Sequence, residues 1–253
     1  MTIMIRMSGE LLDKFNDIEK KHWWWEGRRE LLRYFFKNRR PKHVLDIGCG
    51  TGETLSFLRR FYPSAKLYGV DTSSRAISYS KLRGHKDIKK ASATKLPFKN
   101  DFFDVVLFLD VLEHIKDDNK AIREAKRVLR KGGIVIITAP ALSFIWSDHD
   151  TKQGHQRRYT RREIRKLAAD NQLGISFISY FNFLFSLPII VIRLLSRLKP
   201  FKSFANYDKE INYNIANVTF TNSILRYLFI VEIKALRFIR YPIGISVSAV
   251  LKK

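Results

Sequence analysis

Short apolar runs alternate along the chain with longer segments in which apolar residues recur every three or four positions. Runs of the first kind are typical of strands, and segments of the second kind are typical of amphipathic helices. The runs predict strands at 43–47, 66–71, 103–110, 133–138, 175–180 and 244–250. The spaced segments predict helices at 22–40, 53–61, 73–82, 119–129, 160–167, 183–198 and 219–240, with a helix or frayed tail at 1–20.

Strands that alternate with helices over short links favour a parallel sheet with helices on both faces. The run at 103–110 has almost no polar alternation, as expected for a strand buried on both sides. Residues 244–250 alternate instead, which is typical of a last strand that pairs antiparallel with the strand at 175–180. The predicted fold class is therefore α/β with a doubly wound sheet.

The length of 253 residues is within reach of one α/β domain with additions. We predict a single domain in which 1–41 form an N-terminal helical lid and 42–181 form the core. Residues 182–241 would be a helical insertion before the last strand, which lies in 242–253.

The insertion begins within a long uncharged stretch, from Asn171 to Ile192. Such a stretch is a candidate membrane span. We expect it to divide into a strand and an apolar helix that contains Pro188 and ends near Arg193 and Arg197. That helix is too short to span comfortably, and its basic flank suits a helix lying in the plane of the lipid headgroups. The alternative is a helical interface in a homodimer.

The charge balance predicts an anionic partner. Lys and Arg number 47 and Asp and Glu number 24, a net charge of +23, which suits an acidic membrane surface or nucleic acid. The one cysteine, Cys49, cannot form an internal disulfide, so a reducing compartment is expected. No long apolar segment opens the chain, so a signal peptide is not predicted. We expect a cytoplasmic protein, peripheral on the cytoplasmic face of a membrane.

The glycine-rich stretch after the first strand is the main candidate for ligand binding. Gly48, Gly50 and Gly52 stand at alternate positions between Asp46 and Glu53. Dinucleotide folds use G-x-G-x-x-G and place a pyrophosphate on the helix N-terminus. Here an acid occupies that helix start and would repel the anion, so a cationic or zwitterionic ligand suits the stretch better.

Asp-x-Gly-x-Gly-x-Gly resembles the first motif of class I S-adenosylmethionine (SAM)-dependent methyltransferases. Asp71 ends the second strand, 19 residues past Gly52, and is expected to accept hydrogen bonds from the ribose hydroxyls. Residues 91–98 match the third-strand region of the family, although Ser92 replaces the usual adenine-binding Asp. With Leu-Asp-Val-Leu-Glu-His and Leu-Arg-Lys-Gly-Gly, the likeness covers 43–140 and includes methyltransferases that act on ubiquinone-type lipids.

This resemblance implies a Rossmann-like seven-stranded sheet with an antiparallel last strand, and S-adenosyl-L-methionine as the cofactor. The residues expected to bind the cofactor are Arg28, Asp46, Gly48, Cys49, Gly50, Gly52, Asp71, Thr72, Ser92, Ala93 and Leu109. We interpret Cys49 as a small packed residue and not as a nucleophile.

The helical lid carries three consecutive tryptophans, Trp23 to Trp25, which cannot all face one core. Some are expected to cover a ligand, a partner or a membrane interface. The lid would lie over the cofactor mouth and offer Arg28 or Arg29 to a carboxylate. The alternative is helix capping with solvated charge.

The segment after the fourth strand carries Asp110, Glu113 and His114. His114 is a candidate general base for a hydroxyl acceptor. A second reading is a divalent metal held by all three, similar to some quinone O-methyltransferases. A third is purely structural, with acids at a helix N-terminus. The chain lacks the Asn/Asp-Pro-Pro-aromatic element common in amino-group methyltransferases, which favours an oxygen or carbon acceptor.

A polar loop follows the fifth strand and faces the cleft in this topology. Its Trp-Ser-x-His-Asp and His-x-Arg-Arg-Tyr patterns resemble a bacterial and archaeal methyltransferase group often found with glycan or lipid biosynthesis. The catalytic candidates are His114, Asp148, His149, His155, Arg158 and Tyr159. The alternative is a solvated basic loop.

These features predict a SAM-dependent methyltransferase that O-methylates a small-molecule, lipid-linked or membrane-associated acceptor, such as a glycan, polyprenyl or quinone-like lipid. One alternative is an RNA methyltransferase that uses the basic surface. Another is a non-catalytic binding protein with the same fold.

Overall fold

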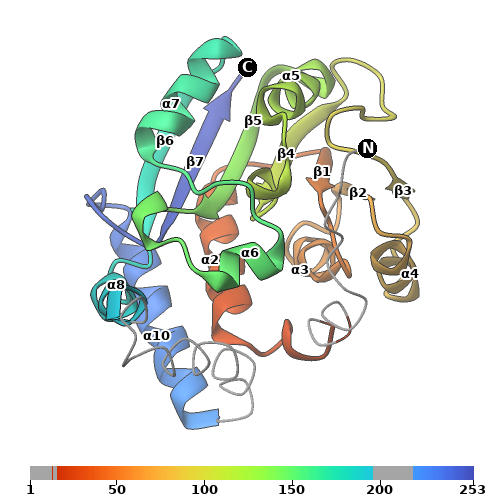
Figure 1. Ribbon diagram of the computed structural model, residues 1–253. Helices are drawn as coiled ribbons and strands as arrows, with labels where there is room; N and C mark the ends of the chain where they lie inside the picture. Colours follow the sequence, from red (N-terminus) through yellow and green to blue (C-terminus); the bar gives the residue numbers. More distant parts are fainter. Residues whose placement is uncertain (1–12, 14–15, 196–218) are drawn as a thin grey trace.

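The computed structural model describes residues 13, 16–195 and 219–253, and a seven-stranded sheet forms its centre (Figure 1). The strands are β1 (His43–Ile47), β2 (Lys66–Asp71), β3 (Ile88–Lys90), β4 (Phe103–Leu109), β5 (Leu129–Pro140), β6 (Gly174–Phe181) and β7 (Ser246–Lys252). Their order is β3-β2-β1-β4-β5-β7-β6, and β7 runs antiparallel to both neighbours. The predicted doubly wound, Rossmann-like sheet with an antiparallel last strand is confirmed.

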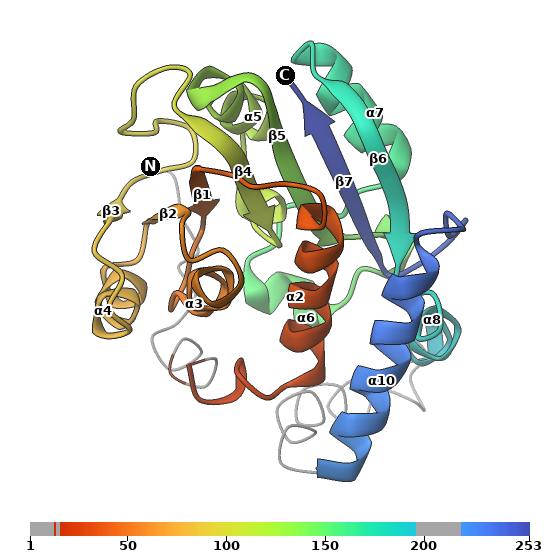
Figure 2. The same cartoon turned by 180° about the vertical axis from the view of Figure 1, so that it is seen from behind.

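The helices lie on both faces of this sheet. They are α2 (Trp23–Phe36), α3 (Glu53–Phe61), α4 (Ser74–Leu82), α5 (Asp118–Val128), α6 (Asp148–Gln153), α7 (Arg161–Asp170), α8 (Ser186–Leu195) and α10 (Thr219–Ala235), with short 3-10 turns η1 (Leu112–His114) and η2 (Ser143–Ile145). In Figures 1 and 2, α2 and α3 cover one face and α5 and α7 cover the other. Alternate residues of β4 therefore enter two separate cores: Val105 and Leu107 pack on the α2–α3 side, and Val106 and Phe108 on the α5–α7 side.

Some predicted boundaries were wrong. The third strand is Ile88–Lys90 and precedes the predicted region at 91–98, in which Ser92 and Lys95 only form an isolated bridge. The second amphipathic helix of the insertion ends at Ala235, short of the predicted residue 240. Pro242 follows closely and disfavours helical conformation at the residue before it. The predicted helix at 1–20 lies largely outside the described residues, as do 196–198 of the first insertion helix.

The insertion packs on the lid, which the sequence did not predict. Gly27 of α2 lies against Phe229 of α10 so closely that a Cβ at Gly27 would stand 1.9 Å from the ring. Asn222 of α10 accepts a hydrogen bond from the Trp23 backbone N–H (2.8 Å) and donates one to the Lys21 carbonyl (2.8 Å). These contacts fix the lid to the last third of the chain (Figure 2).

The tryptophans are largely used in this packing. Trp23 is buried against the rings of Phe185 and Phe229, and Trp24 stacks on Phe181. Trp24 and Trp25 are half-buried, and Trp25 also meets the His22 ring edge to face. That some of the three cover a ligand, a partner or a membrane interface stays a prediction.

No helix within 16–195 or 219–253 is long and apolar enough to cross a membrane.

Candidate functional site

The glycine-rich loop joins the carboxyl end of β1 to the start of α3. The backbone N–H groups of Gly48 and Cys49 both donate to the Val70 carbonyl (2.8 and 3.1 Å), which ties the loop to β2. Gly52 has a φ of 88°, and a Cβ there would stand 2.5 Å from Ser80 Oγ, so only glycine fits. Gly50 also has positive φ, but a Cβ there would meet nothing within 4 Å. The loop is thus rigidly held at its ends and open at its centre.

Asp71 lies beside the open part of this loop. Its carboxylate accepts from the Gly50 backbone N–H (3.0 Å) and from the Ser73 backbone N–H (2.8 Å). Burial raises the pKa of Asp71, and the hydrogen bonds from Ser73, Gly50 and Thr72 oppose that shift. The structure therefore brings the predicted ribose-binding acid to the predicted glycine loop, with carboxylate lone pairs left for a ligand.

Cys49 and Asp46 are buried under the loop. Burial raises the pKa of the Cys49 thiol far above its ordinary range, which agrees with a packed residue and not a nucleophile. Burial also raises the pKa of Asp46 to about 7, against the opposing charge of Arg28. Asp46 sits below the loop as a largely desolvated carboxyl group.

The lid delivers Arg28 to the carboxyl end of β4. Its guanidinium donates to Asp110 Oδ2 (2.7 Å) and to the carbonyl of Leu109, a residue predicted to bind the cofactor (3.2 Å). Arg29 points elsewhere: it is buried and donates to the carbonyls of Glu19 and Lys20. Of the two arginines predicted to meet a carboxylate, Arg28 lies at the carboxyl end of β4 and pairs with Asp110.

Ser92 and Ala93 follow β3 at the same edge of the sheet. The Ser92 hydroxyl accepts from the Thr94 backbone N–H (3.2 Å) and bonds the Thr94 hydroxyl (2.9 Å), so it closes its own turn. Ala93 is buried. The adenine contact of this segment remains a prediction.

Glu113, His114 and His155 form a cluster near the carboxyl ends of β4 and β5. One ligand atom from each lies within 4.8 Å of those of the other two, and the two imidazole rings meet edge to face at 4.8 Å. The predicted grouping of Asp110 with Glu113 and His114 is wrong, because Arg28 and Thr138 engage the Asp110 carboxylate. His155, from the loop after β5, takes its place.

Burial dominates the electrostatics of this cluster. It raises the pKa of Glu113 well above the ordinary range, and the nearby Asp110 charge adds to that rise. It lowers the pKa of His114 to about 4, and the neighbouring His155 contributes. Burial thus disfavours the charged form of both Glu113 and His114.

Asp150 orients His155. It is fully buried, accepts from Nδ1 of His155 (2.8 Å), and forms a two-pronged ion pair with Arg158 (2.9 Å to each oxygen). Burial opposes ionisation, but the bonds from His155 and Arg158 hold the pKa of Asp150 far below its ordinary value. An aspartate on Nδ1 leaves Nε2 of His155 as an acceptor for a proton or a cation.

Sequence reasoning chose Asp148 and missed Asp150. The available signal was the capping box Ser147-x-x-Asp150, which turns that carboxylate inward at the start of α6. The side chains of Asp148 and His149 lie outside the described part of the structure.

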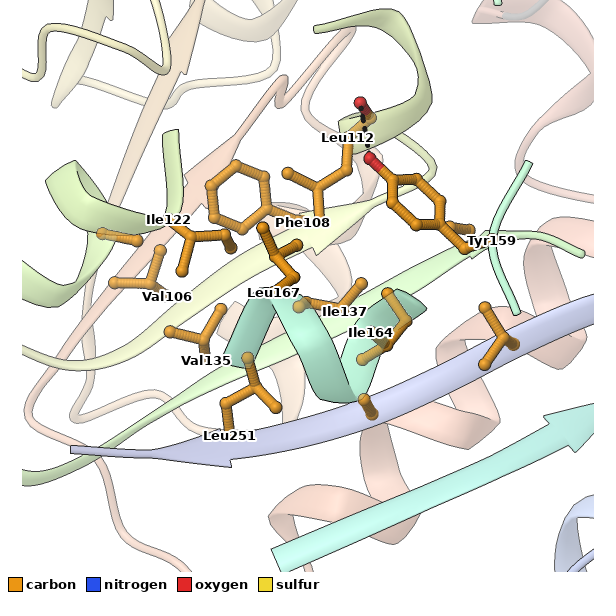
Figure 3. Packing of buried hydrophobic residues seen from close by; sticks show 14 of the residues in the cluster. Val106, Phe108, Leu112, Ile122, Val135, Ile137, Tyr159, Ile164, Leu167 and Leu251 are labelled. Carbon is orange, nitrogen blue, oxygen red and sulfur yellow. Dashed lines mark hydrogen bonds between the residues drawn. The ribbon is translucent and has the colours of Figure 1, made fainter. Parts of the chain in front are cut away.

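Arg158 and Tyr159 have structural roles, contrary to their prediction as catalytic residues. Both are buried. Arg158 is held by Asp150 and the Ala141 carbonyl, and Tyr159 donates to Asp118 (2.8 Å) and to the Leu112 carbonyl (3.3 Å; Figure 3). Burial and the Asp118 charge raise the pKa of Tyr159 above its ordinary value. We infer that they position the loop and do not touch an acceptor.

Comparison with known proteins identifies the central part of the chain. Residues 45–137 match the family model described as a methyltransferase domain. The chain is 33% identical over 116 residues to norajmaline N-methyltransferase of Rauvolfia serpentina, covering 41% of this chain and 38% of that protein. It is 34% identical over 109 residues to the ubiquinone/menaquinone biosynthesis C-methyltransferase of Desulfotalea psychrophila, covering 41% and 44%.

The fold is shared more widely than the sequence. A Haemonchus contortus phosphoethanolamine N-methyltransferase 2, solved with S-adenosyl-L-methionine, aligns with a TM-score of 0.63 at 17% identity, over 97% of this chain and 57% of that one. The chain spans about half or less of the length of the curated relatives named above. The match over 45–137 agrees with the predicted class, a methyltransferase domain, and S-adenosyl-L-methionine is the ligand with which the Haemonchus contortus enzyme of the same fold was solved.

Proposed function

We propose that this protein transfers the methyl group of SAM to a hydroxyl oxygen of a lipid-linked or membrane-associated acceptor. The cofactor would lie over Gly50, with its ribose on Asp71 and its methyl group directed toward the cleft below β4 and β5. The acceptor oxygen attacks the methyl carbon in line, the bond from carbon to sulfur breaks, and S-adenosylhomocysteine leaves. The hydroxyl proton passes to the region of His114 and His155. Positioning supplies most of the rate, as expected for a displacement at a sulfonium methyl group.

The choice of a membrane-associated acceptor rests on one observation, the apolar surface of the insertion. Most exposed large hydrophobic side chains of the described residues lie between Phe183 and Ile239. On α8 they are Leu187, Val191, Ile192, Leu194 and Leu195, and on α10 they are Phe220, Ile224, Tyr227 and Val231. On α10 they recur every three or four residues, which gives one apolar stripe, and on α8 they make up most of the exposed positions. Exposed apolar faces on this scale mark an interaction surface.

Basic residues accompany these stripes. Arg226 and Lys234 lie on α10, and Arg237 and Arg240 follow it. Apolar residues flanked by cations suit a helix pair that lies in the headgroup region of an anionic bilayer. The same balance extends to the whole chain, with its net charge of +23. A peripheral position on the cytoplasmic face of a membrane is part of this proposal.

The insertion also reaches the polar loop. Arg193 of α8 donates to the Ile145 carbonyl (3.1 Å) and lies 3.5 Å from Asp150. A membrane-facing helix is thus joined directly to the carboxylate that orients His155. An acceptor presented at the membrane surface would enter close to this contact.

Flotation with anionic vesicles tests the membrane part of the proposal. The wild-type protein is expected to float with phosphatidylglycerol vesicles, and the double variant Leu187→Glu/Val191→Glu is expected to stay at the bottom. Leu82→Glu is the matched control, because Leu82 is 82% exposed on α4, away from the insertion. Equal flotation of all three proteins, or none by the wild type at low salt, would refute membrane docking through α8. A stable dimer that the double variant abolishes would favour the homodimer interface instead.

Transfer of labelled methyl groups from SAM into separate lipid, glycan and RNA extracts tests the acceptor. Label in the lipid or lipid-linked glycan fraction, in a base-stable ether, supports the proposal. Label in RNA would favour the alternative that the basic surface binds nucleic acid, a class represented by a tRNA methyltransferase of Arabidopsis thaliana that is 36% identical over 98 residues. SAM binding without transfer to any fraction would favour a non-catalytic binding protein.

A further inference from the structure

We propose that Glu113, His114 and His155 hold a divalent transition-metal ion of the zinc type. The three ligand atoms lie within 4.8 Å of one another. Ligands on one tetrahedral zinc stand about 3.3 Å apart, so the side chains would close by up to about 1.5 Å. Two of them are adjacent in η1, and the third comes from the loop after α6, so two segments of the chain converge on the site.

Glu113 shows the clearest sign of a missing partner. Its side chain is 1% exposed, yet Oε2 has no hydrogen-bond partner among the described residues. A buried carboxylate oxygen left without a partner is costly. A cation between Glu113 and the two imidazoles would satisfy it.

His155 already carries the second contact that metal-binding histidines usually make. It bonds the Asp150 carboxylate through Nδ1 at 2.8 Å, which leaves Nε2 for the metal. A carboxylate behind a ligating imidazole fixes the ring and its tautomer. Asp150 is itself held by hydrogen bonds from Arg158 (2.9 Å to each oxygen).

The donor set selects the class of metal. Two imidazole nitrogens and one carboxylate suit zinc or a similar first-row ion, whereas magnesium and calcium prefer oxygen ligands only. Asp110 is a further acid that would favour magnesium, and it already pairs with Arg28 (2.7 Å). Three protein ligands leave one position of a tetrahedral ion open.

The metal ion would also take part in the proposed methyl transfer, and this role alone rests on the proposed function. A zinc-type ion with an open position would bind an acceptor hydroxyl and lower its pKa. Glu113, His114 and His155 would then hold the ion beside the methyl group, and none of them would need to serve as the free base.

Metal binding to the untagged full-length protein tests the site. After treatment with chelator and dialysis, the wild type is titrated with Zn²⁺ and separately with Mg²⁺ in a calorimeter, and the metal content is measured after gel filtration. One equivalent of Zn²⁺ and no measurable Mg²⁺ binding are expected. Glu113→Gln and His155→Ala should each weaken Zn²⁺ binding at least tenfold, and Asp150→Asn should weaken it roughly 10–100-fold. His43→Ala is the control, because His43 lies at the opposite end of β1.

The same samples are titrated with SAM, which reports folding and separates this inference from the proposed function. Zn²⁺ binding that Glu113→Gln and His155→Ala leave unchanged, in variants that still bind SAM, would overturn the metal site. The metal site would also be overturned if the wild type bound Zn²⁺ no more tightly than a His114→Ala/His155→Ala variant does. If a variant does not fold, Co²⁺ loading of the wild type decides: the intense visible bands of a tetrahedral ion support the site, and the weak bands of an octahedral one overturn it. Zn²⁺ binding without methyl transfer would overturn the proposed function and leave the site standing.

Discussion

Replacing Asp71 by alanine gives the most direct test of the cofactor site. The carboxylate accepts one backbone hydrogen bond on each oxygen, from Gly50 and Ser73. A carboxylate offers about four lone-pair positions, so two remain for the two hydroxyls of a ribose. The variant removes those two ligand bonds and also releases the two backbone donors.

The magnitude follows from the number of bonds lost. A hydrogen bond to a charged group contributes about 1.5–3 kcal/mol. Two such bonds at the lower limit amount to about 3 kcal/mol, which is roughly a 150-fold rise in the Kd for SAM. Asp71→Asn keeps one acceptor oxygen but loses the charge, so we expect an intermediate loss. Because burial raises the pKa of Asp71, the measurement is best made at about pH 8, since higher pH favours the carboxylate form.

Isothermal calorimetry with SAM measures this effect, and Asp104→Ala is the matched control. Asp104 also accepts two backbone N–H bonds, from Lys42 and His43 (2.7 Å each), but at the amino-terminal end of β1. Both alanine variants should lower the melting temperature, and only the one at Asp71 should weaken SAM binding. A Kd for Asp71→Ala within about threefold of the wild type would refute the assignment of the ribose to Asp71.

Three further predictions concern stability. Gly27→Ala should lower the stability by about 1–3 kcal/mol and lower the melting temperature, because the new methyl group overlaps the Phe229 ring. A second change, Phe229→Leu, should recover part of the loss. An unchanged melting temperature for Gly27→Ala would contradict the α2–α10 packing. The pKa of Asp46 rises to about 7 on folding, so the folded state binds an extra proton and the free energy of unfolding falls as the pH rises from about 4 to 7. The free energy of unfolding of Asp46→Asn, minus that of the wild type, should therefore be larger at pH 8 than at pH 5. A difference that does not change with pH would show that the carboxyl group is not desolvated. The pKa of Asp150 is lowered far below its ordinary value on folding, so its contribution is complete above about pH 4 and is lost progressively as the pH falls toward the folded-state pKa. Denaturant titrations should show Asp150→Asn less stable than the wild type at pH 7, with a difference that narrows steadily below about pH 4; a difference that stays constant between about pH 4 and about pH 2 would contradict the ion-pair account.

Local patterns in the sequence were sufficient to predict the glycine loop after β1 and the acid that ends β2. Strand β2 was predicted with the observed bounds, Lys66–Asp71, and the glycine loop was placed between the correct strand and helix. These features depend on hydrophobic period and on backbone conformations that glycine alone adopts readily, so neighbouring residues determine them. The apolar insertion was visible for the same reason, as two segments with a helical period.

The partners of the side chains near the carboxyl ends of β4 and β5 could not be predicted from local sequence patterns. The sequence grouped Asp110 with Glu113 and His114 because the three are close along the chain. The structure instead pairs Asp110 with Arg28, 82 residues away, and brings in His155. Whether a charged group meets a ligand or another side chain depends on which distant segments converge on it.

The sequence by itself therefore determined the order of strands and helices, the glycine loop after β1 and the acid at the end of β2. Only the tertiary structure decided that Asp150 holds His155, that Arg158 and Tyr159 are buried, and that α10 packs on the lid through Phe229 and Gly27. The physical reason is the separation along the chain of the residues that interact. Secondary structure follows from interactions between residues a few positions apart, whereas burial and pairing follow from packing across the whole chain.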